Sequence, residues 1–217
     1  MSEDAALAAA RARIEEYRNR ISSLDADARD LIFSEARNHN AWQDKDVSDD
    51  QLRDIYELTK YAPTSTNTQP MRVTFVRSQE AKAKLEPALF DANKEKTMQA
   101  PATAIIAFDT EFWKDFEKFY PIRPEMGERY ANDESLAAAF AEQMCWMQGA
   151  YFILAVRAVG LDAGGMLGFD KGIVNEAFFA GTNLKTNFLC NIGYGDVSGI
   201  KGPRLFRYDF EEVCEIV

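Results

Sequence analysis

The stretch from Ser135 to Val159 constrains the fold more than any other part of the chain. It has the composition of a helix, and its middle, from Met144 to Leu154, is apolar nearly all the way round. A helix on a protein surface keeps one polar face, whereas a helix that is apolar on every side must be buried on every side. In a chain of 217 residues, this pattern favours a helix covered by its own sheet and by a partner subunit.

Other segments carry patterns typical of helices. Apolar residues recur at helical spacing over residues 4–35. A second helix is expected to begin at Ser48, where Ser48 and Gln51 match a capping box, and to end near Tyr61, because Pro63 disfavours helix at the residue before it. Residues 79–98 are predicted to be helical with a break near Pro87, and a short helix is predicted from Asp170 to Ala180.

Strands are few. The alternating or apolar runs at 72–77, 102–108 and 185–194 predict strands. Residues 109–133 look irregular, and Gly160 to Gly168 looks like a turn because glycines interrupt it. Long helices with few strands indicate the α+β class.

Composition excludes several function classes. The chain has 25 Lys and Arg against 35 Asp and Glu, a net charge of −10, which disfavours nucleic acid and anionic membranes as partners. Its apolar runs are shorter than the ~18 residues that span a bilayer. The acidic N-terminus does not resemble a secretory signal, so a cytoplasmic location is expected.

The cysteines and the histidine limit the chemistry further. Cys145, Cys190 and Cys214 are odd in number and far apart, which argues against a disulfide framework or a Cys-x-x-Cys metal clamp. His39 is the single histidine, so a His-rich zinc site is excluded and no metal is expected. A hydrogen-bonded structural role for His39 is favoured over catalysis.

The chain lacks a Rossmann glycine fingerprint, a phosphate loop and a nucleophile elbow. What remains is a set of amide, hydroxyl and basic residues in loops, which suits flavin mononucleotide (FMN): basic side chains for the phosphate, and amides for the pyrimidine edge of the ring. Each group also has a plain interpretation as a connecting loop, as solvated charge or, for the aromatic residues of 112–120, as core. These groups are Arg37 to Asn40; Thr64, Ser65, Asn67 and Gln69; Asn93 and Lys96; Gly164 to Gly168; and Lys201 with Arg204.

From about Phe33 to the C-terminus the sequence resembles the FMN-dependent nitroreductase family. The residues that carry the resemblance are Ala36 to Trp42, the loop from Ala62 to Pro70, Asn93 to Lys96, Gly165 to Asp170, and Asn191 to Gly195 followed by Arg204-Leu205. Within the family it looks closest to the subgroup that includes malonic semialdehyde reductase of pyrimidine degradation, on Arg37 to Trp42, Lys96 to Met98, and Ala177 to Gly181 with Leu184-Lys185.

This resemblance implies an N-terminal helical extension over residues 1–32 and a single FMN-binding domain over residues 33–217. The implied fold is a mixed central sheet wrapped by helices in an intertwined homodimer, with two FMN sites at the interface. In one subunit, the implied FMN contacts are Arg37, Asn38, His39, Asn40, Asn93, Lys96, Leu167, Gly168, Lys201 and Arg204. Pro63, Thr64, Ser65 and Asn67 are expected to come from the other subunit.

The family pattern has a second basic residue where this chain has Asn40, so Lys96 is the remaining candidate to neutralise reduced flavin near N1. The implied activity is ping-pong hydride transfer from NADH or NADPH through flavin N5 to malonic semialdehyde, forming 3-hydroxypropionate, or to a nitro compound or quinone. Phe112, Trp113 and Phe116 are expected to shape the substrate pocket, and no catalytic residue is assigned. The alternative is a flavin-binding or carrier dimer without turnover.

Overall fold

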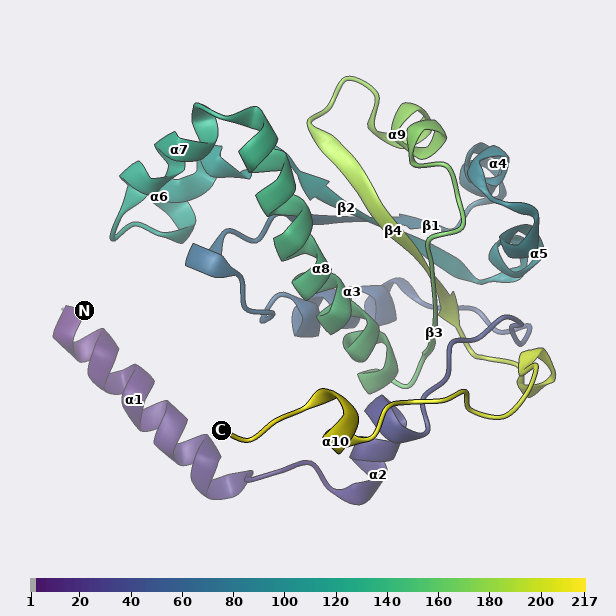
Figure 1. Ribbon diagram of the computed structural model, residues 1–217, viewed down its shortest axis with the longest axis horizontal. Helices are drawn as coiled ribbons and strands as arrows, with labels where there is room; N and C mark the ends of the chain where they lie inside the picture. The colour runs from purple at the N-terminus through teal and green to yellow at the C-terminus, as the bar shows by residue number, and fades with distance from the viewer. Residues whose placement is uncertain (1–2) are drawn as a thin grey trace.

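A four-stranded sheet in the order β1-β2-β4-β3 lies at the centre of the chain in the computed structural model, which describes residues 3–217 (Figure 1). The strands are β1 (Met71–Val76), β2 (Ala102–Asp109), β3 (Asp162–Met166) and β4 (Leu184–Gly193). All three ladders between them are antiparallel. The parallel element of the expected mixed sheet is limited to an isolated bridge between Asn38 and Ala163.

Helices cover both faces of this sheet (Figure 1). The α3 and α8 helices pack on one face, and α4 and α9 on the other. Strand β2 supplies both cores by alternation: Ile106 faces α8, whereas Ile105 faces the other layer. The helix bounds are α1 (Glu3–Arg20), α2 (Ala26–Arg29), α3 (Asp49–Thr59), α4 (Gln79–Leu85), α5 (Asp91–Gln99), α6 (Phe116–Phe119), α7 (Glu128–Ala131), α8 (Glu134–Ala158), α9 (Lys171–Phe179) and α10 (Phe210–Val213).

Several helix ends follow the sequence signals. Ser48 and Gln51 form both hydrogen bonds of the predicted capping box at the start of α3. The Asp170 carboxylate accepts from the first backbone N–H groups of α9, and the expected break near Pro87 is a 3₁₀ turn between α4 and α5. The expected α+β class is confirmed.

The single helix expected over residues 4–35 is wrong. The first helix ends at Arg20, and a new one begins after Asp25, whose side chain accepts from the N–H of Ala28. Two serines and this capping aspartate compete for the backbone and interrupt the periodicity. The chain then passes through a π-helical turn, Asp30–Ser34.

The glycine-rich turn expected at 160–168 is also wrong, because most of it is strand β3. Glycine is required here by close packing rather than by a turn: a Cβ at Gly164 would lie 2.8 Å from the carbonyl oxygen of His39. The neighbouring backbone can therefore pair with β3 only if this side chain is absent.

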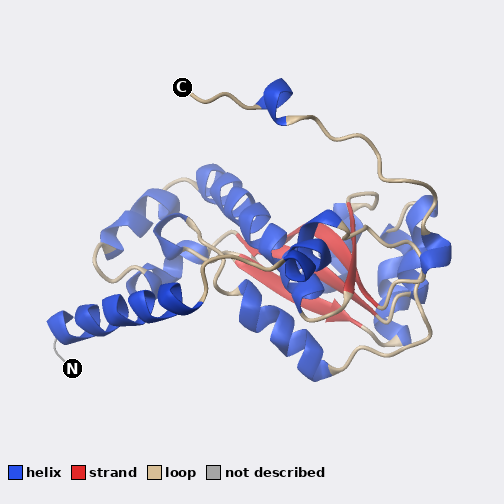
Figure 2. Cartoon of the chain, turned by 90° about the horizontal axis from the view of Figure 1, so that it is seen from below, coloured by secondary structure: helices blue, strands red, loops and turns tan. Residues whose placement is uncertain are grey.

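The chain alone covers only one side of α8. Cys145, Phe152 and Val156 are buried, while Trp146 and Tyr151 are each 42% exposed. The C-terminal segment beyond residue 200 extends away from the sheet as an arm, and α1 also lies outside the core (Figure 2). Within residues 3–217, no helix is both long and apolar enough to cross a membrane.

Candidate functional site

The segment from Arg37 to Asn40 runs along the free edge of strand β3. Asn38 forms the parallel bridge with Ala163, and the N–H of His39 donates to the Ala163 carbonyl at 3.0 Å. The Asn38 side chain accepts from the Gly165 N–H at 2.7 Å and donates to the Gly165 carbonyl at 3.4 Å. This pairing fixes the segment at one end of the sheet.

His39 is a structural residue in this arrangement. Its ring is buried, and Nε2 lies 3.3 Å from a carboxylate oxygen of Asp162. The other oxygen of Asp162 accepts from the Gly195 N–H at 2.8 Å. A Cβ at Gly195 would lie 2.0 Å from Nδ1 of His39, so the glycine leaves space for the ring. Asp162, at the start of β3, therefore joins His39 to the loop after β4.

Asn40 and Lys96 meet beside this segment. The Lys96 ammonium donates to Oδ1 of Asn40 at 3.0 Å. Burial lowers the pKa of Lys96, and the nearby charge of Lys201 lowers it further. A partly desolvated cation thus stands next to the position where the family pattern would place a basic side chain and this chain has asparagine.

The arm beyond β4 is tied to the same place. Nη2 of Arg37 donates to the carbonyl of Gly202 at 2.9 Å, and both terminal nitrogens of Arg204 lie 3.3 Å from the carbonyl oxygen of Ala36. These contacts gather four cations, Arg37, Lys96, Lys201 and Arg204, in a chain whose net charge is −10. A local positive field of this kind suits an anionic group such as a phosphate.

Asn93 and the loop after β3 form the next part of the site. Nδ2 of Asn93 donates to the Gly168 carbonyl at 2.8 Å. The N–H of Gly165 is directed at Asn38, and Leu167 is the first residue after β3. Leu167 is 60% exposed.

The loop from Pro63 to Gln69 lies elsewhere. Nδ2 of Asn67 donates to the carbonyl of Phe119 at 3.1 Å, and Oγ1 of Thr64 accepts from the Gln69 N–H at 3.2 Å. The 11-residue helix α3, which rises about 16 Å, separates this loop from the Arg37 segment (Figure 1). One chain therefore does not bring the two predicted groups together, and Pro63, Ser65 and Asn67 are all exposed.

Phe112 and Phe116, which were expected to shape the substrate pocket, lie in the core of this chain instead. They are 1% and 2% exposed and belong to the core beneath α8. Phe112 packs on Tyr130 with ring centroids 5.0 Å apart, so neither ring presents a face to a planar substrate. Trp113 is half-buried against the same core, and its place in a substrate pocket stays a prediction. The helical spacing of these aromatics was a core signal.

A buried polar network that sequence reasoning missed holds Lys96 in place. Nε1 of Trp42 donates to the Lys96 carbonyl at 2.8 Å. Asn191, which is 0% exposed, donates to Thr97 at 3.1 Å and accepts from Thr103 at 2.8 Å. An asparagine inside the apolar run of β4 was the signal that could have revealed it, because a buried amide needs partners.

Comparison with known proteins agrees with this geometry. Residues 37–194 match the model of the nitroreductase family. A Burkholderia lata protein named as an NADH dehydrogenase/NAD(P)H nitroreductase is 46% identical over 196 residues, 90% of this chain and 100% of its own. A protein of the same description from Stenotrophomonas maltophilia is 49% identical over 194 residues, 89% of this chain and 98% of its own.

Solved structures share the fold at lower sequence identity. A nitroreductase in complex with FMN from Exiguobacterium sibiricum has a TM-score of 0.77 at 19% identity, with 90% of this chain and 99% of that chain covered. The nitroreductase ydfN of Bacillus subtilis has a TM-score of 0.75 at 20% identity, with coverages of 88% and 99%. By its sequence match and its fold, the chain belongs to the nitroreductase family.

Proposed function

We propose that this protein is an FMN-dependent NAD(P)H oxidoreductase that works as a homodimer. The observation that carries the proposal is the convergence of Arg37, Lys96, Lys201 and Arg204 beside the open edge of β3. The relatives named as NAD(P)H nitroreductases and the fold neighbour that binds FMN support the same cofactor and electron donor.

The residues present fit FMN. Arg37, Lys201 and Arg204 would hold the phosphate, since guanidinium and ammonium groups are its usual partners. Lys96, Asn40 and Asn93 would face the polar edge of the ring, where an amide can match both donor and acceptor groups. Asn38 and His39 would act mainly by shaping this segment, because their side chains are engaged with Gly165 and Asp162. The backbone N–H groups of Leu167 and Gly168 would donate to flavin N5.

A second copy of the chain would complete the site. Pro63, Thr64, Ser65 and Asn67 are too far from the cation cluster to reach the same ligand within one chain, but they are exposed or half-buried and available to a partner subunit. The uncovered side of α8, with Trp146, and the apolar C-terminal arm, with Phe206 and Phe210, are the surfaces such a partner would bury. Burial of this apolar area would favour association.

When bound, FMN would supply the chemistry of hydride transfer between NAD(P)H and an electron acceptor. The chain contributes placement and charge. Lys96 would supply a positive field beside the polar edge of the ring, and Trp42 and Asn191 donate hydrogen bonds to its backbone carbonyl. When the acceptor is an aldehyde, its oxygen must also gain a proton to form the alcohol. No acidic side chain is assigned to this step, and solvent can deliver the proton.

We propose malonic semialdehyde as the physiological acceptor, on the resemblance of Arg37 to Trp42 and of Lys96 to Met98 to that subgroup. Nitro compounds and quinones are the alternative acceptors. Steady-state kinetics with malonic semialdehyde, a nitroaromatic and a quinone, each with NADH and with NADPH, test this directly. We expect the largest kcat/KM for the aldehyde; a clear preference for a nitroaromatic would refute this choice of acceptor.

The oxidoreductase assignment itself has a simpler test. The purified protein should be yellow and dimeric, and its colour should bleach when NADH or NADPH is added under nitrogen. Colour without bleaching would instead support a flavin carrier. A colourless protein that cannot be reconstituted with FMN would contradict both functions.

A further inference from the structure

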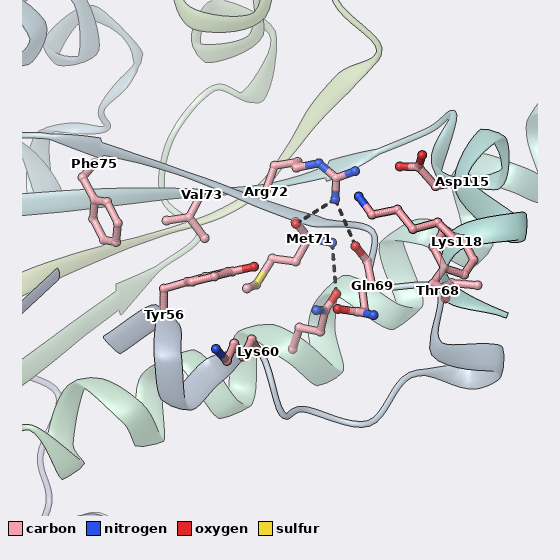
Figure 3. A pocket seen from close by; sticks show the side chains of 12 residues that line it. Tyr56, Lys60, Thr68, Gln69, Met71, Arg72, Val73, Phe75, Asp115 and Lys118 are labelled. Atoms are coloured by element: carbon pink, nitrogen blue, oxygen red, sulfur yellow. Dashed lines mark hydrogen bonds between the residues drawn. The ribbon is translucent and has the colours of Figure 1, made fainter. Parts of the chain in front are cut away.

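A cavity that is partly lined by the loop from Pro63 to Gln69 contains none of the residues of the cation cluster described above. It has a volume of about 530 Å³ and lies between α3, the start of β1 and α6. Figure 3 shows its two ends: Tyr56, Val73 and Phe75 form an apolar wall, while Arg72, Lys118 and Asp115 lie at the polar end.

Arg72 is held rigidly at the polar end. Its Nη1 donates to the carbonyls of Gln69 and Met71 at 3.0 and 3.1 Å (Figure 3). Its Nη2 pairs with Asp109 at 2.8 Å. A guanidinium has five N–H groups, so two remain for a ligand. Because its side chain is fixed before any ligand arrives, binding costs little further conformational entropy.

Lys118 adds a second cation. Its ammonium group points toward the Arg72 guanidinium in Figure 3. Among the described residues, no carboxylate lies within 4.0 Å of this ammonium, although every other lysine or arginine of the cavity wall has an acidic partner. Two like charges directed at one place, with only one of them neutralised, favour an anion between them.

The remaining charged groups of the cavity limit this field. Lys60 pairs with Glu57 in the same helix and adds no net charge. Asp115 lines the same polar end and repels anions. The site is thus suited to a single negative group rather than to a multiply charged one.

We infer that this cavity binds a small organic acid, with the carboxylate between Arg72 and Lys118 and a short apolar stem against Tyr56, Val73 and Phe75. The inference rests on the proposed function, because Thr68 and Gln69 continue directly from Asn67, which is proposed to reach the FMN of the partner subunit. The carboxylate would then belong to the electron acceptor, which makes this cavity a specificity site for carbonyl compounds that carry an acid group.

Butyrate is a suitable probe, and butyramide is its uncharged match. Ligand-observed NMR titration of the FMN-loaded protein should show butyrate binding at least tenfold more tightly than butyramide. Lys118→Gln should weaken butyrate about five- to tenfold, the loss expected for one partly screened charge-assisted contact. Asp115→Asn should strengthen it about two- to fivefold, because a repulsive charge is removed. Both side chains are exposed, so neither change should affect folding.

Lys114→Gln is the matched control, because Lys114 lies one turn earlier, pairs with Glu111 at 2.6 Å and faces a different hollow. It should leave butyrate binding unchanged. Equal binding of butyrate and butyramide, or equal effects of Lys114→Gln and Lys118→Gln, would overturn the inference. These titrations need no turnover, so their failure is separate from a failure of FMN reduction by NAD(P)H.

The same two cations could instead receive a phosphate of the electron donor. Adenosine 2′,5′-bisphosphate distinguishes this source: if it binds more tightly than butyrate and loses more affinity in Lys118→Gln, the cavity binds a nucleotide phosphate and the carboxylate assignment is wrong.

In steady-state kinetics, Lys118→Gln should raise KM for an acid-bearing aldehyde about five- to tenfold, with little change in kcat and no change in KM for an uncharged quinone.

Discussion

Replacing Arg204 by alanine should remove most of the FMN affinity while leaving the fold intact. Two of the five N–H groups of a guanidinium are directed at the Ala36 carbonyl, both at 3.3 Å, which leaves three for a phosphate. A charge-assisted hydrogen bond contributes about 1.5–3 kcal/mol, and each 1.4 kcal/mol is tenfold in affinity. Because Arg204 is exposed in the isolated chain, we expect a loss near one such bond, a ten- to hundredfold increase in Kd.

Fluorescence titration of the flavin-free protein with FMN measures this change, since free FMN is fluorescent and bound FMN is quenched. Arg207→Ala is the control, because Arg207 donates to the nearby carbonyls of Leu205 and Phe206 at 3.2 and 2.8 Å. The melting temperature without FMN should be the same for both variants. If Arg204→Ala changes Kd less than twofold, or if Arg207→Ala weakens FMN equally, Arg204 is not a phosphate ligand.

Three further changes test other parts of the structure. Lys96→Met should make the bound flavin harder to reduce. Because burial lowers the pKa of Lys96 below 10.5, the FMN affinity of the wild-type protein should fall at alkaline pH, where this ammonium loses its proton. The variant should lack this fall, and an identical pH profile in the variant would contradict the role of Lys96. Gly195→Ala places a Cβ 2.0 Å from Nδ1 of His39 and should lower the free energy of unfolding in urea by about 1–3 kcal/mol. Gly202→Ala is the control and should leave it unchanged, because the space around Gly202 is open. Equal stabilities of the two variants would refute the packing argument. In the flavin-free protein, a disulfide reagent at pH 8 should react with Cys214, which is exposed. Cys145 and Cys190 should not react, because burial raises the pKa of each thiol to about 12. Rapid reaction of a Cys214→Ser variant would show that the core opens.

Local signals in the sequence predicted most of the elements correctly. Ser48 with Gln51, Asp170 and Pro87 each act within a few residues, and so their effect on helix ends can be read without the tertiary fold. Strand β3 could not be predicted this way. Its glycines have no strand propensity, and they are used because another backbone segment lies against Gly164.

In the candidate site, too, the residue types could be predicted from the sequence, whereas contacts between distant segments could not. The segments that supply Arg37, Lys96 and Arg204 were identified from residue types and from the family resemblance, but the sequence left open whether Lys96 reaches Asn40. That contact depends on α5 being held by Trp42 and Asn191, two residues from distant parts of the chain. The misassignment of Phe112 and Phe116 has a similar origin, because an apolar helical stripe looks alike in a core and in a lid.

The mutual contacts between residues 36–37 and 202–204 have a practical consequence. Among residues 3–217, the hydrogen bonds that join residues 202–204 to residues 36–37 come from two arginines, each donating to a carbonyl of the other's segment. An anion bound by both arginines would hold the start of the exposed C-terminal arm against the body of the protein. The rate at which trypsin cleaves after Lys201 would therefore report how much of the protein carries FMN. Protein without FMN would be cleaved first, and the cleaved protein could no longer bind FMN.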